Sequence, residues 1–202
     1  RYTSQLVGTK IYIPERNGTA LEIIDTTNNT VTTITNFFNA SRYRYISQLV
    51  GTKIYIPEYI GTALEIINTT NNTVTTLPSF FNESRRYTSQ LVGTKIYIPQ
   101  NNGTALEIID TTNNTITTLT NFFNANRNRR TSQLVGTKIY IPQYGGTDLE
   151  IINTTNNTVT TITNFFNASR YRRTSQLVDG KLYIPEWGST ALEIIDTTTD
   201  TV

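Results

Sequence analysis

The stretch SQLVGTKIYIP, residues 4–14, decides the fold because the chain returns to it four more times. The string SQLV begins again at Ser47, Ser89, Ser132 and Ser175, so the copies are 42 or 43 residues apart. Repeats with a period of about 20 to 50 residues form arrays in which each unit packs on its neighbours. We therefore expect one domain over residues 1–202, with repeats at about 1–43, 44–86, 87–129, 130–172 and 173–202.

Each repeat contains four short segments with the properties of β-strands. They are rich in β-branched and aromatic residues or alternate polar with apolar ones, and Gly, Asn and Asp separate them. In the first repeat these segments, here called strands A to D, cover residues 4–7, 10–13, 20–25 and 31–34. Pro14 fits the end of strand B, because proline cannot donate to a sheet ladder.

Four antiparallel strands repeated at this period predict an all-β protein, a β-propeller. We expect five blades of four antiparallel strands, the last of which lacks its outer strand D because the sequence stops at Val202. Five units close most simply into a five-membered ring. The alternative is a larger ring that further sequence or a second chain completes.

Several residues that recur in every repeat predict the packing of the blades. Alternation in strand C places Leu21 and Ile23 on one side of the sheet and Glu22 and Ile24 on the other. The eight phenylalanines form pairs directly after strand D and are expected to pack between neighbouring blades. The glutamines of strand A, such as Gln5, either line the central channel or bond between blades.

The second repeat carries a likeness to known repeats. Its residues 44–77, RYISQLVGTKIYIPEYIGTALEIINTTNNTVTTL, have an arginine before strand A, KIY in strand B, and a strand C that ends in Asn before a turn. This pattern resembles the kelch repeat, although Pro and a polar residue stand in place of its paired glycines and strand D lacks its aromatic. The Asn–Thr turn followed by Val is equally similar to the YVTN type of propeller repeat. Both resemblances imply a propeller, and the kelch resemblance implies protein partners.

The composition excludes several kinds of chemistry. The chain has no His, Cys or Met, which rules out Ser-His-Asp and Cys-His catalysis, thiolate metal sites and disulfides. Near-identical repeats also place no unique acid, base or metal-binding cluster in any one blade. We therefore expect a protein that is not an enzyme, with no catalytic residue, no metal and no cofactor. No segment approaches the about 20 apolar residues that cross a bilayer, so no membrane partner is expected.

The charges divide between the two faces of the predicted propeller. Because the strands alternate in direction, the B–C loops and D–A junctions lie on one face, and the A–B and C–D turns lie on the other. All twelve arginines fall on the first face with five acidic residues, whereas the five lysines fall on the second face with five aspartates. A formal charge of +2 for the whole chain therefore conceals one strongly basic face.

The same basic face carries the loops that differ most between repeats. Between YIP and LEI they read ERNGTA, EYIGTA, QNNGTA, QYGGTD and EWGSTA, and tyrosines alternate with the arginines of the D–A junctions. Large aromatics at loop tips stack on sugars, bases or peptide rings, and arginine binds oxyanions in a bidentate way. The candidate binding residues are Arg42, Arg44, Arg85, Arg86, Arg129, Arg130, Arg172, Arg173, Tyr59, Tyr144 and Trp187. The alternative for any one arginine is a structural bond to a carbonyl or to a glutamate of the next blade.

These features predict a binding scaffold whose B–C/D–A face holds an anionic or aromatic partner, either a peptide segment or a glycan. The alternative is a structural, self-assembling repeat protein with no small ligand, which would form homo-oligomers through the open edge of the last blade. Nucleic acid is a further alternative that no recognised motif supports. Eleven Asn-x-Ser/Thr sequons, of which Asn28 begins one, favour an extracellular location if they carry glycans.

Overall fold

The computed structural model describes residues 2–82 and 85–202, and nearly all of its regular structure is β-strand in the predicted order. Strand A is β1 (Gln5–Val7), β7 (Gln48–Val50), β11 (Gln90–Val92), β15 (Gln133–Val135) and β19 (Gln176–Val178). Strand B is β2 (Lys10–Pro14), β8 (Lys53–Pro57), β12 (Lys95–Pro99), β16 (Lys138–Pro142) and β20 (Lys181–Pro185). Strand C is β4 (Leu21–Asp25), β9 (Leu64–Asn68), β13 (Leu106–Asp110), β17 (Leu149–Asn153) and β21 (Leu192–Asp196). Strand D is β5 (Thr30–Ile34), β10 (Thr73–Leu77), β14 (Thr115–Leu119) and β18 (Thr158–Ile162).

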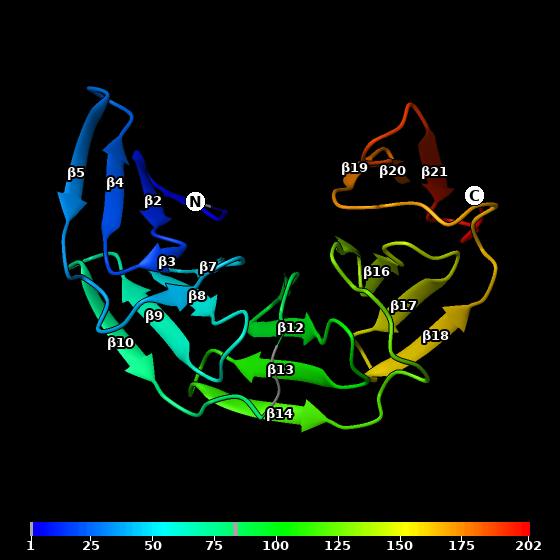
Figure 1. The fold of residues 1–202 in the computed structure, drawn as a ribbon, viewed down its shortest axis with the longest axis horizontal. Helices are drawn as coiled ribbons and strands as arrows, with labels where there is room; N and C mark the ends of the chain where they lie inside the picture. Colours follow the sequence, from blue (N-terminus) through cyan, green and yellow to red (C-terminus); the bar gives the residue numbers. More distant parts are fainter. Residues whose placement is uncertain (1, 83–84) are drawn as a thin grey trace.

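The strands of each repeat pair antiparallel in chain order to make one sheet, here called a blade. The first four blades have four strands, and the fifth has the three strands β19, β20 and β21. Figure 1 shows the blades following one another around a common axis, with strand A innermost and strand D outermost. The four-stranded units, and a last blade without strand D, are therefore as predicted.

Local sequence explains how each blade turns back on itself. The A–B turn of the first blade is the two-residue loop Gly8–Thr9, and Gly8 has a φ of +59°, a conformation that glycine adopts without steric cost. The fifth blade uses Asp179 and Gly180 instead, both with positive φ, which is the Asp-Gly preference of a type I′ turn. In the C–D turns, side-chain carboxylates and amides accept bonds two residues ahead, as Asp25 Oδ1 does from Thr27 N at 2.9 Å.

The hydrophobic core lies between the blades, one cluster at each of the four contacts between successive blades. Strand C alternates as predicted: Leu106 and Ile108 face the following blade, while Ile109 faces the preceding one. The second phenylalanine of each pair is buried in the same cluster, and Phe123 is 1% exposed. The contact between the third and fourth blades is made of Tyr97, Leu106, Ile108, Phe123, Ile139, Ile141 and Ile152. Since no blade covers its own apolar faces, stability comes from stacking blade on blade.

Polar bonds reinforce these contacts near the axis and at the turns. Gln5 Nε2 donates to the carbonyl of Ser47 in the next blade at 2.9 Å, and Gln48 and Gln90 make the same bond one blade further on. The strand B tyrosines also reach across: the Tyr55 hydroxyl donates to Asn114 Oδ1 at 3.0 Å. Of the two roles open to the glutamines, these three therefore take the bond between blades.

The ring is open. Figure 1 shows an arc with an opening between the first blade and the last. Side chains of the last blade that face this opening are uncovered, since Leu192 is 55% exposed whereas its equivalent in the fourth blade, Leu149, is 0% exposed. The expected closure into a five-membered ring therefore does not occur. The four contacts are nearly identical in composition, so they repeat one angle between blades, and that angle does not bring five blades through a full turn.

Candidate functional site

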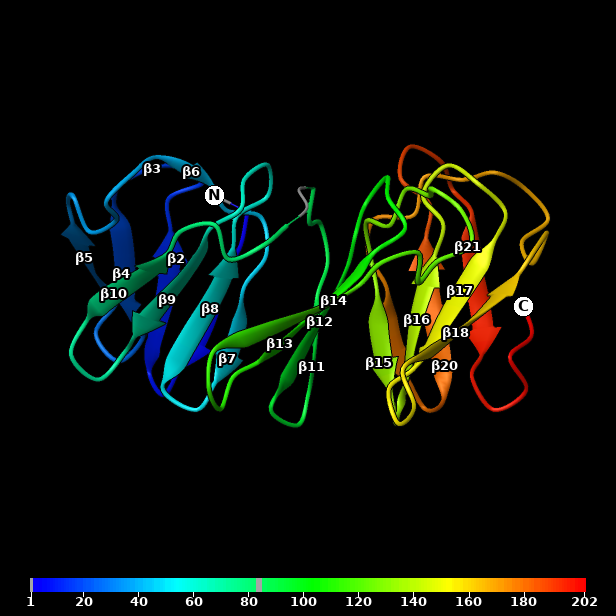
Figure 2. The ribbon, with the colours of Figure 1, turned by 90° about the horizontal axis from the view of Figure 1, so that it is seen from below.

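The B–C loops and D–A junctions meet on one face of the arc. Figure 2 shows β3 (Asn17–Gly18) and β6 (Arg42–Tyr43) at one end of the blades, while the tight turns project at the opposite end. The two strands pair antiparallel, so a B–C loop of the first blade bonds directly to the junction that follows it. Equivalent single bridges join Gly103 to Arg127 and Gly146 to Arg170. The loops and junctions thus form one continuous surface, here called the loop face.

Four of the candidate arginines do not reach this surface. Each is 0% exposed and stacks on the buried phenylalanine of the preceding blade, with guanidinium-to-ring distances of 3.7 or 3.8 Å. They are Arg44, Arg86, Arg129 and Arg172. The prediction that these four arginines bind a partner is wrong, because their side chains are enclosed between blades. The structural alternative, a bond to carbonyls and to a glutamate of the next blade, describes them correctly.

Arg129 shows how completely such an arginine is bonded. Its Nε and Nη2 donate to both carboxylate oxygens of Glu150 in the next blade, at 2.5 and 2.7 Å. Its Nη1 donates to the carbonyls of Gln100 and Gly103 in the preceding loop, and Nη2 also donates to the carbonyl of Ala125. All five N–H groups of the guanidinium therefore have acceptors. We call the unit of Arg129, Glu150 and Phe123, and its equivalents, the Arg–Glu clasp.

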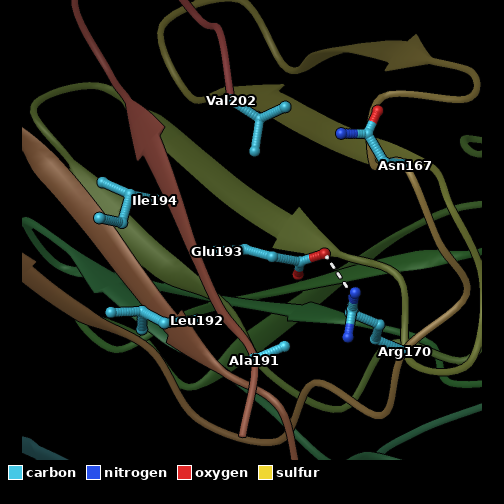
Figure 3. Close-up of a pocket in the computed structure, with 7 residues that line it drawn as sticks. All are labelled: Asn167, Arg170, Ala191, Leu192, Glu193, Ile194 and Val202. Carbon is cyan, nitrogen blue, oxygen red and sulfur yellow. Dashed lines mark ion pairs between the residues drawn. The ribbon is translucent and has the colours of Figure 1, made fainter.

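A second set of arginines is partly exposed and neutralised by acids. Arg42 Nη1 lies 2.9 Å from Glu58 Oε2, and Arg127 Nη2 lies 2.6 Å from Asp148 Oδ2. Arg170 pairs with Glu186 in the same way and also lies 3.5 Å from Glu193 (Figure 3). Of the candidate residues, Arg42 thus reaches the loop face with its charge already balanced.

The cavity drawn in Figure 3 is a consequence of how the last blade is built. It has a volume of about 400 Å³ and lies along β21, between Arg170 and Val202. In the other blades strand C pairs along its length with strand D, as β17 does with β18, whereas β21 pairs with β20 and meets the chain that follows it at the single bridge Asp196–Thr201. The cavity therefore occupies the place that strand D takes in the other four blades.

Three of the four remaining described arginines of the loop face lie against aromatic rings. Within residues 2–82 and 85–202, Arg16, Arg85, Arg130 and Arg173 have no carboxylate at ion-pair distance. Arg130 lies 4.0 Å from the centre of the Tyr144 ring, and Arg173 lies 3.8 Å from that of Trp187. Arg16 stacks on Tyr2 and Tyr45, at 4.6 and 4.9 Å. Arg85 is exposed and contacts none of these rings, and Arg1 and Glu83, which the sequence puts on this face, lie outside the described residues.

The aromatic rings also touch one another across three blades. Ring centres of Tyr45 and Tyr59 are 4.5 Å apart, those of Tyr59 and Tyr87 are 4.5 Å apart, and Tyr2 is 4.7 Å from Tyr45. The loop face therefore brings together the candidates Tyr59, Tyr144, Trp187, Arg130 and Arg173. It adds Arg16, Tyr2, Tyr45 and Tyr87, which the candidate set omitted. We call these nine residues the Arg–aromatic cluster.

A pocket of about 340 Å³ opens within the cluster. It is lined by Tyr2, Tyr45, Tyr87, Arg130, Arg173 and Thr174, which come from the junctions of all five blades. A signal that points to these residues is present in the sequence, because each aromatic or arginine of this lining stands two residues before an SQLV string. In the described ranges no group of three or more acidic side chains is placed to hold a metal ion. Nor does any described segment form an apolar helix of membrane-spanning length.

Burial in the cluster raises the pKa of Tyr59 to about 12, and its bond to the Tyr87 hydroxyl, 2.6 Å away, adds to the effect. An unfolded tyrosine ionises near pH 10, so this contribution to stability is complete below about pH 10 and is lost as the pH rises through about 12. We expect Tyr59→Phe to flatten the loss of stability over this alkaline range. Urea midpoints measured from about pH 9 to 12 test this, and equal slopes for both proteins would contradict it.

Comparison with known proteins agrees with this architecture. No protein-family model matches the sequence, and neither does any curated protein. Among solved structures, the extracellular domain of a protein described as a one-component system from B. thetaiotaomicron aligns with 98% of the chain, at a TM-score of 0.74 and 10% identity. The chain is a β-propeller.

Two further structures share the propeller. Kuenenia stuttgartiensis hydrazine synthase aligns with 94% of the chain at a TM-score of 0.71, and streptogramin B lyase aligns with 96% at 0.74, both at 12% identity. The propeller spans 28%, 60% and 68% of the length of the three matched chains, in the order given. At these identities the likeness concerns the fold alone.

Proposed function

We propose that this propeller is a binding scaffold, not an enzyme, and that its loop face holds an anionic or aromatic partner, a peptide segment or a glycan. The repeats are of the kelch-like or YVTN-like type. The observation that carries the proposal is that Arg16, Arg130 and Arg173 lie against aromatic rings with no acid beside them, although every clasp arginine is neutralised. These three charges are directed to the surface and not to the core.

The chemistry of the cluster favours such a partner. Stacking on a ring holds a guanidinium by its flat face and leaves its N–H edge free for a bidentate bond to a carboxylate, phosphate or sulfate. The Nε atoms of Arg16 and Arg130 are buried without an acceptor among the described residues, so their guanidinium groups are not fully bonded within the protein, unlike that of Arg129. The tyrosines and Trp187, which is 56% exposed, supply flat apolar area for a ring of the partner.

A binding assay on matched charge variants tests the proposal. We expect the triple variant Arg16→Gln, Arg130→Gln and Arg173→Gln to lose affinity for immobilised acidic peptides or acidic glycans about tenfold or more, since each charge-assisted bond contributes about 1.5–3 kcal/mol. Binding to the wild type should also weaken as salt rises from about 50 to 300 mM. The control variant Lys10→Gln, Lys53→Gln and Lys95→Gln removes three charges from the opposite face and should bind as the wild type does. Equal losses in both variants would refute the proposal.

A structural, self-assembling role is the second candidate, and one observation favours it. Leu192 and Ile194 are 55% and 39% exposed on the last blade, while the same positions of the inner blades are buried against a neighbour. A second molecule could cover this apolar surface. Assembly of this kind would be insensitive to the arginine variants, so the same assay separates the two candidates.

A further inference from the structure

One position of the repeat changes its chemistry from blade to blade. It is the residue two before each SQLV string, and in chain order it is Tyr2, Tyr45, Tyr87, Arg130 and Arg173. The flanking sequences are near-copies of one another, yet this position divides into three tyrosines followed by two arginines. All five side chains line the pocket of about 340 Å³ on the loop face.

The division gives the pocket two unlike sides. Tyr2, Tyr45 and Tyr87 form an aromatic side, with ring centres 4.7 Å apart for the first two and 5.6 Å apart for the last two. Arg130 and Arg173 form a cationic side, because they come from the two successive junctions before the fourth and fifth blades. A closed set of five identical residues would have made a symmetric pocket, whereas this one is polarised.

The two guanidinium groups are held in position and remain available. Tyr144 serves both: its ring centre is 4.0 Å from Arg130 and 5.7 Å from Arg173, and its hydroxyl accepts a bond from Arg173 Nη2 at 3.3 Å. The guanidinium of Arg173 also stacks on Trp187, at 3.8 Å from the ring centre. The guanidinium of Arg130 also lies 4.9 Å from the ring centre of Tyr87. Neither arginine has an acidic partner among the described residues, so their charges face the pocket uncompensated.

We propose that this pocket binds an aromatic ring that carries a phosphate or sulfate group. The ring would lie against the tyrosines, and the oxyanion would be shared by Arg130 and Arg173. An aliphatic anion would leave the aromatic side bare, and a neutral ring would leave two cations without a counter-charge. A volume of about 340 Å³ is in the range of pockets that take small ligands. The inference rests on the proposed function and specifies its ligand.

Titration calorimetry with the two halves of the ligand tests the inference. Phenyl phosphate and phenyl sulfate are the probes, and inorganic phosphate and phenol are the halves. We expect the better of the two esters to bind about tenfold or more tightly than either half, because only an ester engages both sides of the pocket. Phosphotyrosine and sulfotyrosine peptides, compared with the free esters, then show whether the ligand is a protein side chain or a small molecule.

Substitutions test the cationic side and the aromatic side of the pocket separately. Arg130→Gln with Arg173→Gln should lower ester affinity about tenfold or more, while Tyr2→Leu, at a side chain 62% exposed, should weaken the ester and leave inorganic phosphate unchanged. Arg85→Gln removes a loop-face charge outside the pocket and should have no effect. Equal affinities for ester and inorganic phosphate, or no binding of any probe, would overturn the inference. If acidic peptides or glycans still bound in an Arg130-dependent way, the proposed function would stand and only this inference would fall.

Discussion

Replacing Arg129 by glutamine is expected to lower the free energy of unfolding by about 3 to 5 kcal/mol. The substitution would leave the Glu150 carboxylate buried without its partner, and an unpaired buried charge carries a cost of that size. It would also leave the carbonyls of Gln100 and Gly103 without the donor that now bonds them. Urea unfolding measures the change, and hydrogen exchange should place it at the contact between the third and fourth blades.

The neighbouring residue supplies a matched control. Arg130→Gln makes the same chemical change one position along the chain, at a partly exposed arginine with no acidic partner in the described residues. We expect its effect on stability to stay within about 1 kcal/mol, which covers the loss of stacking on Tyr144. If the two variants were equally stable, the clasp would have no structural role. Arg129→Met combined with Glu150→Leu should recover much of the loss, because that pair buries no charge.

Phe123→Ala is expected to cost about 3 to 5 kcal/mol, the usual range for removing a buried phenylalanine ring. The ring is 1% exposed in the cluster between the third and fourth blades, and the guanidinium of Arg129 lies 3.7 Å from its centre. Its loss would open a cavity and uncover one flat side of the clasp at the same time. The same unfolding experiment measures it.

Phe122→Ala is the control for the second prediction. Phe122 packs edge to face on Phe123, with ring centres 5.0 Å apart, but it is only partly buried. Removing it should cost clearly less than removing Phe123. A loss of equal size at both positions would mean that the pair, and not the clasp contact, determines the stability.

The blades were predictable from sequence because each strand carries its own local signal. Pro14 ends strand B as expected, and the observed strand bounds agree with the predicted ones to within one residue. The alternation of Leu21 and Ile23 with Ile24 correctly assigned the two sides of strand C. The opening of the arc was not predictable, since it depends on the angle at which whole blades pack, and no single residue encodes that angle.

The site was predicted only in part, for a physical reason. An arginine in a junction is normally taken as a surface charge, because burying it without a partner is costly. Arg44 finds its partner, Glu65, 21 residues away in the following blade, and the sequence does not state that distance in space. Arg130 and Arg173 occur directly after clasp arginines, so only the structure separates each pair into one buried and one available charge.

The Arg–Glu clasp makes the contacts between successive blades, here called joints, interchangeable along the arc. Each joint accepts the same arginine from one side and the same glutamate from the other, so the order of the blades is set by chain connectivity alone. A duplication that inserts one whole repeat brings both halves of a working joint with it. Growth and shortening of such a protein therefore require no new contact to evolve, and divergence is free to concentrate on the few junction residues that the joints do not use.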